Sequence, residues 1–547
     1  MNPDSTDPPP PNPATPPSPP PGWRYAAPLL ALCALASFQL FILPKDVGYT
    51  YDSTVYLAGA RSLAEQHSYR FVAHVGAPTI GFYPPLQSLY LSLAWMLNGQ
   101  FPANIPWIIG SMVALSLVVS WLMYLYLARE GLPVCAALVC SLAFVSSPLW
   151  FGNLVHLYSE TLFTALGLAL ALLWQTPSPL AGNRRWLMTG ALFGLLYLTK
   201  TAAVGPIAGM LILLAWNSRA RLTRAAACFV LPVLLAFLCW RAMRGASPGY
   251  AEALRLRWDQ EGGWWPLFLF QCRSAWDYVS GQPFLDILFP AWLRAPHLQA
   301  VRRLGLASPI SFAVLATTLG FMACAAVGWW RTRTPFASAL ALLILLYVAQ
   351  LIVWPYHLGS RVLFVIMPFM IGWAWHGITN MPQRAGVQAW LRRVLACLLG
   401  GATALNLHMS ARERPGHERL NSLPELIEVS AWIRDHVPAD TSIAAGYSLP
   451  ILHLRHYTGR ALLEDYFTEP VGFVPIAFRS HRQRAGYLVA IRDAGTGAAR
   501  SLPSHLEVLN RRYPGLFEIA AESSQGRYMV LRVNQPVQER YLKDYFP

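Results

Sequence analysis

Charged side chains are scarce in this chain of 547 residues. Asp, Glu, Lys and Arg together make up 13% of it, whereas 55% of the residues are hydrophobic and the mean hydropathy is +0.36. A soluble globular protein carries about 25% charged residues. The chain therefore lacks the polar side chains that a water-facing surface of its size needs. This argues against a cytosolic enzyme and indicates several membrane spans.

Lysine is nearly absent, although the formal net charge is +15. Only Lys45, Lys200 and Lys543 occur, so 39 of the 42 basic residues are arginine. The apolar content is too high for a nucleic-acid-binding protein, and arginine at the ends of membrane helices explains the positive charge better. We therefore expect membrane lipids, and no nucleic acid, as partners.

The eight cysteines show no spacing typical of a disulfide framework or a zinc site. Cys272 stands alone in a predicted loop. The other seven lie in apolar runs: Cys33, Cys135, Cys140, Cys228, Cys239, Cys324 and Cys397.

Long apolar runs, by contrast, are abundant. Residues 1–23 are rich in proline and predict a disordered tail, and the run at 25–43 predicts a first, retained span. The segment 187–216 is too long for one span and short for two, which indicates a hairpin of short helices with Lys200 near its turn. Further runs of spanning length lie at 105–128, 133–150, 154–175, 225–243, 309–330, 336–354, 361–378 and 392–409, so the total is about eleven transmembrane helices.

Arginine in the short loops predicts the orientation. The residues concerned are Arg129, Arg184, Arg185, Arg219, Arg221, Arg224, Arg331, Arg333, Arg384, Arg392 and Arg393. Alternating spans put all of them in the cytoplasm with the N-terminus, as the positive-inside rule requires, provided that the helix at 86–97 does not cross. About twelve residues cannot span a core of ~30 Å. Residues 24–410 then form a transmembrane domain whose long loops, at about 44–104 and 244–308, lie outside.

Residues 411–547 have a different character. Charged residues become frequent, with 17 basic and 15 acidic, and the apolar runs shrink to strand length. Strands are predicted at 442–446, 487–491, 517–521 and 528–533, and helices at 423–436 and 503–512. The pattern predicts a small extracytoplasmic α/β domain.

The first external loop carries the most specific signal. It reads Tyr49-Thr50-Tyr51-Asp52-Ser53-Thr54-Val55-Tyr56 and ends Tyr83-Pro84-Pro85-Leu86. Three further elements follow in order: Ser159-Glu160, a Gly-Leu-rich helix ending Leu198-Thr199-Lys200, and Tyr356-His357 with Arg361. Together these elements resemble the C-type (GT-C) integral-membrane glycosyltransferases, in particular the aminoarabinose transferase and protein O-mannosyltransferase group.

The resemblance implies a mainly α polytopic membrane protein of GT-C type in a bacterial inner membrane, with a cytoplasmic N-terminus and a periplasmic C-terminal domain. It also implies an inverting enzyme that moves a sugar from a polyprenyl-phosphate donor to a lipid, glycan or protein acceptor. A transporter or flippase of lipid-linked substrates is the alternative, since it too would need many spans and an intramembrane lysine. No internal repeat typical of transporters is visible in the sequence.

Asp52 is the candidate general base, because an acceptor hydroxyl that attacks an anomeric carbon needs a carboxylate near its proton. The alternative is that Asp52 is the N-cap of a helix beginning at Ser53.

Lys200 is the candidate group for the departing lipid phosphate, because an ionisable residue inside a membrane segment is costly and usually functional. A lysine that reaches to the outer interface is its alternative. Arg361 could bind the same phosphate bidentately or serve as an interfacial anchor.

Glu160 and His156 lie one helical turn apart and could bind a divalent cation or position the acceptor, although two ligands do not make a metal site. A hydrogen-bonded pair at a helix start is the alternative. The resemblance implies that Tyr356 joins Lys200 and Arg361 at the donor phosphate. The expected substrate-binding residues are Tyr56, Tyr83, His156, Glu160 and His357.

Overall fold

The computed structural model of this protein describes most of the chain. The described residues are 23–44, 46–47, 50–175, 182–216, 222–245, 264–279, 309–332, 334–353, 360–379, 385–413, 423–445, 451–464, 484–492, 502 and 504–545. The proline-rich tail, most of the loop at 244–308, and Tyr356 and His357 therefore lie outside the described residues.

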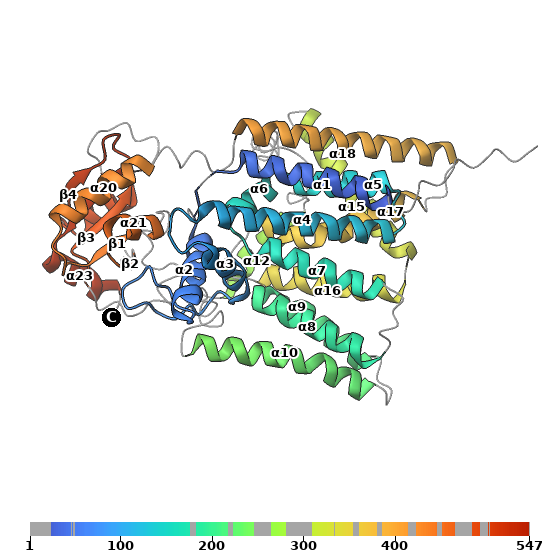
Figure 1. Ribbon diagram of the computed structural model, residues 1–547, viewed down its shortest axis with the longest axis horizontal. Coiled ribbons are helices and arrows are strands. Elements are labelled where there is room, and N and C mark those ends of the chain that lie inside the picture. Colours follow the sequence, from blue (N-terminus) through green and yellow to red (C-terminus); the bar gives the residue numbers. More distant parts are fainter. Residues whose placement is uncertain are drawn as a thin grey trace, which may run out of the picture.

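Long apolar helices run side by side and form a bundle (Figure 1). Five described segments are long and apolar enough to cross a membrane: α1 (Trp23–Ile42), α4 (Ile105–Arg129), α10 (Leu222–Arg244), α16 (Pro335–Val353) and the stretch from Arg361 to Thr379. The last combines the 3₁₀ helix η2 (Ser360–Ile366) with α17 (Met367–Thr379). Other described helices of the chain are α12 (Trp264–Val279), α15 (Pro309–Thr332) and α18 (Ala385–Glu413).

The prediction of eleven spans is not confirmed, because several apolar runs form bent or short helices. The run at 133–150 becomes α5 (Val134–Val145) and α6 (Pro148–Val155), which meet at 55°; counted as one span, they raise the total among the described residues to six. The bend has a local cause, since the Ser147 side chain accepts a hydrogen bond from the Trp150 backbone and starts a new helix at Pro148. Three apolar helices are shorter than a span: α3 (Leu86–Leu97), α7 (Glu160–Gln175) and the unit of η1 (Thr201–Ala203) with α9 (Val204–Trp216).

The segment at 187–216 breaks at Lys200, where the sequence predicts a turn. Helix α8 (Asn183–Thr199) ends there, and Lys200 itself is extended, with φ −157° and ψ 132°, before η1 and α9 begin. Lys200, the only lysine of the sequence that lies within a long apolar segment, therefore stands at the end of a helix and not in the middle of one.

Glycines let α15 and α17 pack with their backbones in close contact. A Cβ atom on Gly328 would lie 1.7 Å from the carbonyl oxygen of Trp373, and one on Gly377 would lie 2.0 Å from that of Cys324. Small residues at such crossings are typical of helix pairs in membranes.

We expect Gly328→Ala to push these two helices apart and to lower the free energy of unfolding by about 1–3 kcal/mol. Gly320→Ala is the matched control, because Gly320 lies on the same helix with no atom within 4 Å of its Cβ position. Thermal melting of both variants in the same detergent measures the effect. Equal melting temperatures would contradict the close contact.

Residues 423–545 contain a small α/β unit. Its sheet has the strand order β2-β1-β3-β5-β4, in which β1 pairs in parallel with β2 and β3, and β5 pairs antiparallel with β3 and β4. The strands are β1 (Ile443–Ala445), β2 (Leu463–Glu464), β3 (Tyr487–Ile491), β4 (Phe517–Glu522) and β5 (Tyr528–Val533); the helices are α20 (Leu423–His436), α21 (Ile451–Thr458), α22 (Ser504–Arg512) and α23 (Gln535–Tyr545). Four strands and two helices fall where the sequence predicts them; β2, α21 and α23 were not predicted.

Helices α2 (Tyr51–Gln66) and α3 lie between the bundle and this C-terminal unit (Figure 1). The unit is also joined directly to the loops around α2. Leu462 exchanges backbone hydrogen bonds with the loop, donating to Ala73 at 3.1 Å and accepting from Val75 at 2.9 Å. His453 pairs with Asp46 at 2.5 Å, and both side chains are buried.

His74, in the same junction, predicts an acid sensitivity. Its ring is buried against Phe71, and burial, followed by the charge of Arg455, lowers its pKa to about 3. The unfolded chain then binds a proton below pH 6.5 that the folded protein does not bind, so stability is lost as the pH falls. One such group costs about 2 kcal/mol between pH 6.5 and pH 5. Melting temperatures measured across this range should fall less in His74→Phe; parallel curves would contradict the assignment.

Candidate active site

Asp52 lies at the N-terminal end of α2. Thr50 is the N-cap, because its side chain accepts a hydrogen bond from the backbone of Ser53 at 3.3 Å. The alternative that Asp52 caps the helix is therefore wrong. Asp52 occupies the first turn instead, where the helix dipole favours a carboxylate, and 19% of its side chain is exposed.

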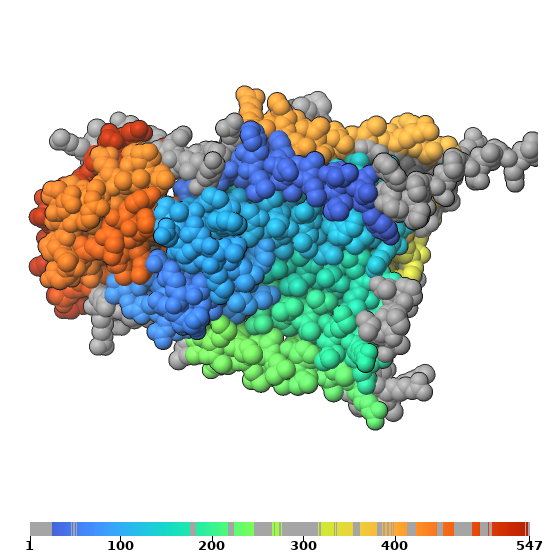
Figure 2. All heavy atoms as spheres, in the orientation of Figure 1, coloured from blue at the N-terminus to red at the C-terminus, as the bar shows by residue number. Residues whose placement is uncertain are grey.

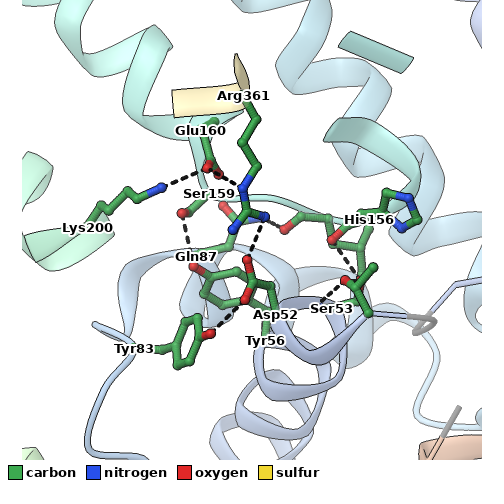
Figure 3. Close-up of polar contacts among 12 residues, drawn as sticks. Asp52, Ser53, Tyr56, Tyr83, Gln87, His156, Ser159, Glu160, Lys200 and Arg361 are labelled. Carbon is green, nitrogen blue, oxygen red and sulfur yellow. Dashed lines mark hydrogen bonds and ion pairs between the residues drawn. The ribbon is translucent and has the colours of Figure 1, made fainter. Parts of the chain in front are cut away.

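Arg361 joins the two carboxylates of the site. It is the second residue of η2, and its Nη1 lies 2.7 Å from Asp52 Oδ2, while its Nε lies 3.5 Å from Glu160 Oε1. Its guanidinium also lies over the Tyr158 ring, 4.2 Å from the ring centre. A planar fork that contacts two acids and an aromatic face holds one orientation. Figure 3 shows Arg361 reaching between Asp52 and Glu160.

Glu160 also holds Lys200, at 2.7 Å from Nζ to Oε1. Its side chain is only 2% exposed, against 17% for Lys200 and 21% for Arg361. A carboxylate this buried needs paired cations, and here two converge on it from α8's end and from η2. The sequence offered Lys200 no acidic partner in its own segment; the partner comes from the first residue of α7.

The turn before α7 places Glu160. Leu157 adopts a left-handed backbone with φ 53°, although it is not glycine, and its carbonyl accepts a hydrogen bond from the buried Gln87 side chain at 3.0 Å. A left-handed non-glycine residue marks a turn that its surroundings hold in place. Gln87 and Tyr158 were not predicted as site residues, although each directly adjoins a quoted motif.

Two tyrosines, Tyr56 and Tyr83, complete the site around Asp52. The Tyr83 hydroxyl donates to Asp52 Oδ1 at 2.6 Å, and the Tyr56 hydroxyl donates to Ser159 Oγ at 2.9 Å. Their rings meet edge to face, with centres 5.4 Å apart. The structure therefore brings Tyr56 and Tyr83 together with Asp52, whereas Tyr356 and His357 lie outside the described residues.

His156 contributes its backbone carbonyl to the site. Its carbonyl accepts a hydrogen bond from Ser53 Oγ at 2.9 Å, and its ring packs on Tyr158. No group of three His, Cys, Asp or Glu side chains that could hold a metal ion occurs among the described residues. Because Glu160 is already paired with two cations, whose charges oppose a divalent ion, Glu160 and His156 as arranged do not fit a metal site.

Comparison with known proteins identifies the fold. No family model and no curated protein sequence matches the chain. Among solved structures, ArnT from Cupriavidus metallidurans bound to undecaprenyl phosphate matches with a TM-score of 0.55 at 12% identity, covering 94% of this chain and 99% of that one. The Archaeoglobus fulgidus oligosaccharyltransferase in complex with Zn and sulfate matches with 0.51 at 12% identity, over 85% and 68%. The arabinofuranosyltransferase AftD from Mycobacteria matches with 0.50 at 14%, over 92% and 40%. The GT-C fold predicted from the sequence is thus confirmed.

Proposed function

We propose that this chain, which has the GT-C fold, transfers a sugar from a polyprenyl-phosphate donor to an acceptor hydroxyl. One observation carries the proposal: Asp52, Glu160, Lys200 and Arg361, from four separate parts of the sequence, form one connected cluster. An ion pair that only stabilises the fold needs one acidic and one basic residue, whereas this cluster has two of each. Four charged groups, three of them partly exposed, form a site that can bind a charged substrate.

Lys200 and Arg361 suit the phosphate of the donor. Arg361 offers a planar fork and Lys200 a compact charge, and both kinds of group bind phosphate in proteins. The similar ArnT structure contains undecaprenyl phosphate, which supports a polyprenyl phosphate as the donor lipid. On binding, the phosphate competes with Asp52 and Glu160 for these cations. Tyr356, five residues before Arg361 in the sequence, is proposed to join them.

Asp52 is the proposed general base. The acceptor hydroxyl gives its proton to an Asp52 oxygen while the acceptor oxygen forms a bond to the anomeric carbon. The bond from that carbon to the phosphate oxygen breaks on the opposite face, so the configuration inverts. The electron pair goes to the phosphate oxygen, where Lys200 and Arg361 stabilise the charge. Tyr83 holds Asp52 in position through its 2.6 Å hydrogen bond.

Glu160 is a positioning residue in this scheme. It is buried, and it binds Lys200 and Arg361 on the side away from Asp52 (Figure 3). Its carboxylate holds both cations within reach of one phosphate. Tyr56, His156 and His357 are proposed to line the sugar and acceptor sites.

The orientation belongs to the same proposal. The arginine-rich short loops support an N-terminus in the cytoplasm and a C-terminal unit in the periplasm of a bacterial inner membrane. The acceptor, whether lipid, glycan or protein, then meets the donor at the outer face.

The direct test uses purified protein in nanodiscs with a synthetic polyprenyl phosphate that carries a labelled sugar. We expect the label to pass to an acceptor with an inverted anomeric centre, seen by NMR, and free polyprenyl phosphate to accumulate. If label instead crosses the bilayer of proteoliposomes while still attached to its lipid, the flippase reading replaces this one.

A further inference from the structure

One face of α16 contacts the chain next to each of the two cations proposed for the phosphate. Gln350 binds the turn that follows Lys200, and Tyr347 binds η2 beside Arg361. Residues three apart on a helix lie on the same face, so a single helix reaches both places. Figure 1 labels α16, and Figure 2 shows the teal and green segments that cover it on this side, where it packs against α9.

Gln350 replaces a missing hydrogen bond at the break after Lys200. In a continuous helix the Gly205 backbone N–H would donate to the carbonyl of Thr201, four residues earlier. Here Gln350 Oε1 accepts from the Gly205 N–H at 2.6 Å, and Gln350 Nε2 donates to the Thr201 carbonyl at 3.3 Å. A side chain inserted in this way bends a helix, and backbone groups left unpaired in an apolar segment are costly. The Gln350 carboxamide therefore stabilises the turn that carries Lys200.

Gly205 lets α16 come close enough for this insertion. A Cβ atom on Gly205 would lie 2.6 Å from the carbonyl oxygen of Leu346 and 2.8 Å from Gln350 Oε1. Small residues allow the backbones of two membrane helices to approach in this way. The close packing and the two hydrogen bonds are therefore parts of one arrangement.

Tyr347 holds η2 from the same face of α16. Its hydroxyl donates at 2.8 Å to the carbonyl of Val362, the residue after Arg361, and both Tyr347 and Val362 are buried. The Tyr347 ring also stacks on Phe163 of α7, with the ring centres 6.0 Å apart. Phe163 follows Glu160 by three residues on that helix. Tyr347 therefore fixes η2 relative to the helix whose first residue holds both cations.

We propose that Gln350 and Tyr347 are positioning residues that set the distance between Lys200 and Arg361 for one phosphate. Lys200 Nζ and Arg361 Nε contact the same oxygen of Glu160, Oε1, so their spacing suits an anion that both can touch. Each positioning residue acts through the backbone next to a cation and is not required to touch the donor. This inference rests on the proposed function for the identity of the phosphate, and on the hydrogen bonds of α16 for the spacing.

The test measures the binding of undecaprenyl phosphate by native mass spectrometry of protein released from phosphatidylcholine nanodiscs. Tyr347→Phe removes one hydroxyl and should weaken binding about three- to tenfold, the range for one lost hydrogen bond. Gln350→Leu removes two hydrogen bonds and should weaken binding more. Tyr90→Phe and Gln39→Leu are the matched controls, because these side chains also donate to backbone carbonyls, at 2.5 and 3.1 Å, but in α4 and α5. Both controls should bind the lipid as the native protein does.

Double-mutant cycles separate positioning from a general loss of stability. If Gln350 acts through Lys200, Gln350→Leu should weaken binding much less in the Lys200→Gln background than in the native one. Tyr347→Phe should likewise have a smaller effect in the Arg361→Gln background. A substitution that only loosens the fold would weaken binding by the same factor in both backgrounds.

Two results would overturn the proposal: native affinity in Tyr347→Phe, or equal factors in both backgrounds of the cycles. If thermal melting shows that Gln350→Leu is unfolded, Tyr347→Phe, the smaller change, decides the outcome. No binding of undecaprenyl phosphate by the native protein would overturn the donor assignment and this inference together. Binding that depends on Tyr347 and Gln350, without any sugar transfer, would overturn the proposed reaction alone.

Discussion

Asp52→Asn should reduce the turnover rate about 10²–10⁴-fold, the range of a lost general base. Asparagine keeps the size of the side chain and can still accept the hydrogen bond from Tyr83, so the fold and the affinity for polyprenyl phosphate should stay close to those of the native protein. Initial rates at saturating donor, together with donor binding and thermal melting, separate these effects.

Asp435→Asn is the control for Asp52→Asn. Asp435 is 61% exposed on α20, and its only ion pair within the described part of the chain is with its neighbour Arg434. Its rate should equal the native rate. If Asp52→Asn also transfers sugar at the native rate, Asp52 is not the base.

Arg361→Gln should have the second largest effect. It removes the 2.7 Å contact with Asp52, the 3.5 Å contact with Glu160 and one of two cations proposed for the phosphate. Loss of one group that stabilises developing charge typically costs about 10²–10³-fold in rate. We expect weaker binding of polyprenyl phosphate and slower transfer, because the residue acts on both the bound donor and the transition state.

Arg361→Lys tests whether a positive charge at this position is sufficient for sugar transfer. A lysine keeps the positive charge but cannot contact both carboxylates with one planar group, so it should restore little of the rate. Full activity in Arg361→Lys would show that the bridging geometry is not needed. Arg129, at the other end of the bundle, offers a control as Arg129→Gln, whose donor affinity should be unchanged.

The sequence predicted the parts of the fold that depend on local pattern. The short helix at 86–97, the break at Lys200 and four strands of the C-terminal unit follow from runs of apolar residues and their lengths, and the structure contains them. The number of spans did not follow in the same way. Hydropathy counts apolar residues, but it does not register the Ser147 cap or the turn at Leu157, which divide apolar runs into helices too short to cross.

The contacts of the candidate site show the same limit. Order along the chain indicated that Asp52, Glu160, Lys200 and Arg361 belong together, but not which of them pair. Glu160 takes both cations because α7 begins at the point where α8 ends and η2 begins. Such pairing depends on how helices cross, which lies outside any local pattern. Their roles in catalysis stay predictions until the variants are measured.

The contacts between Leu462 and the loop at 73–75, and between His453 and Asp46, also constrain how the protein is made. A ribosome releases residue 46 about 400 residues before it releases residue 453, and chains of this size fold in parts as they emerge. The segment that contains Asp46, α2 with Asp52, and the loop at 73–75 therefore stays incompletely anchored until residues 453–462 have been synthesised. Cleavage within the C-terminal unit, or early termination of synthesis, should leave the helices inserted but the loop open to proteases.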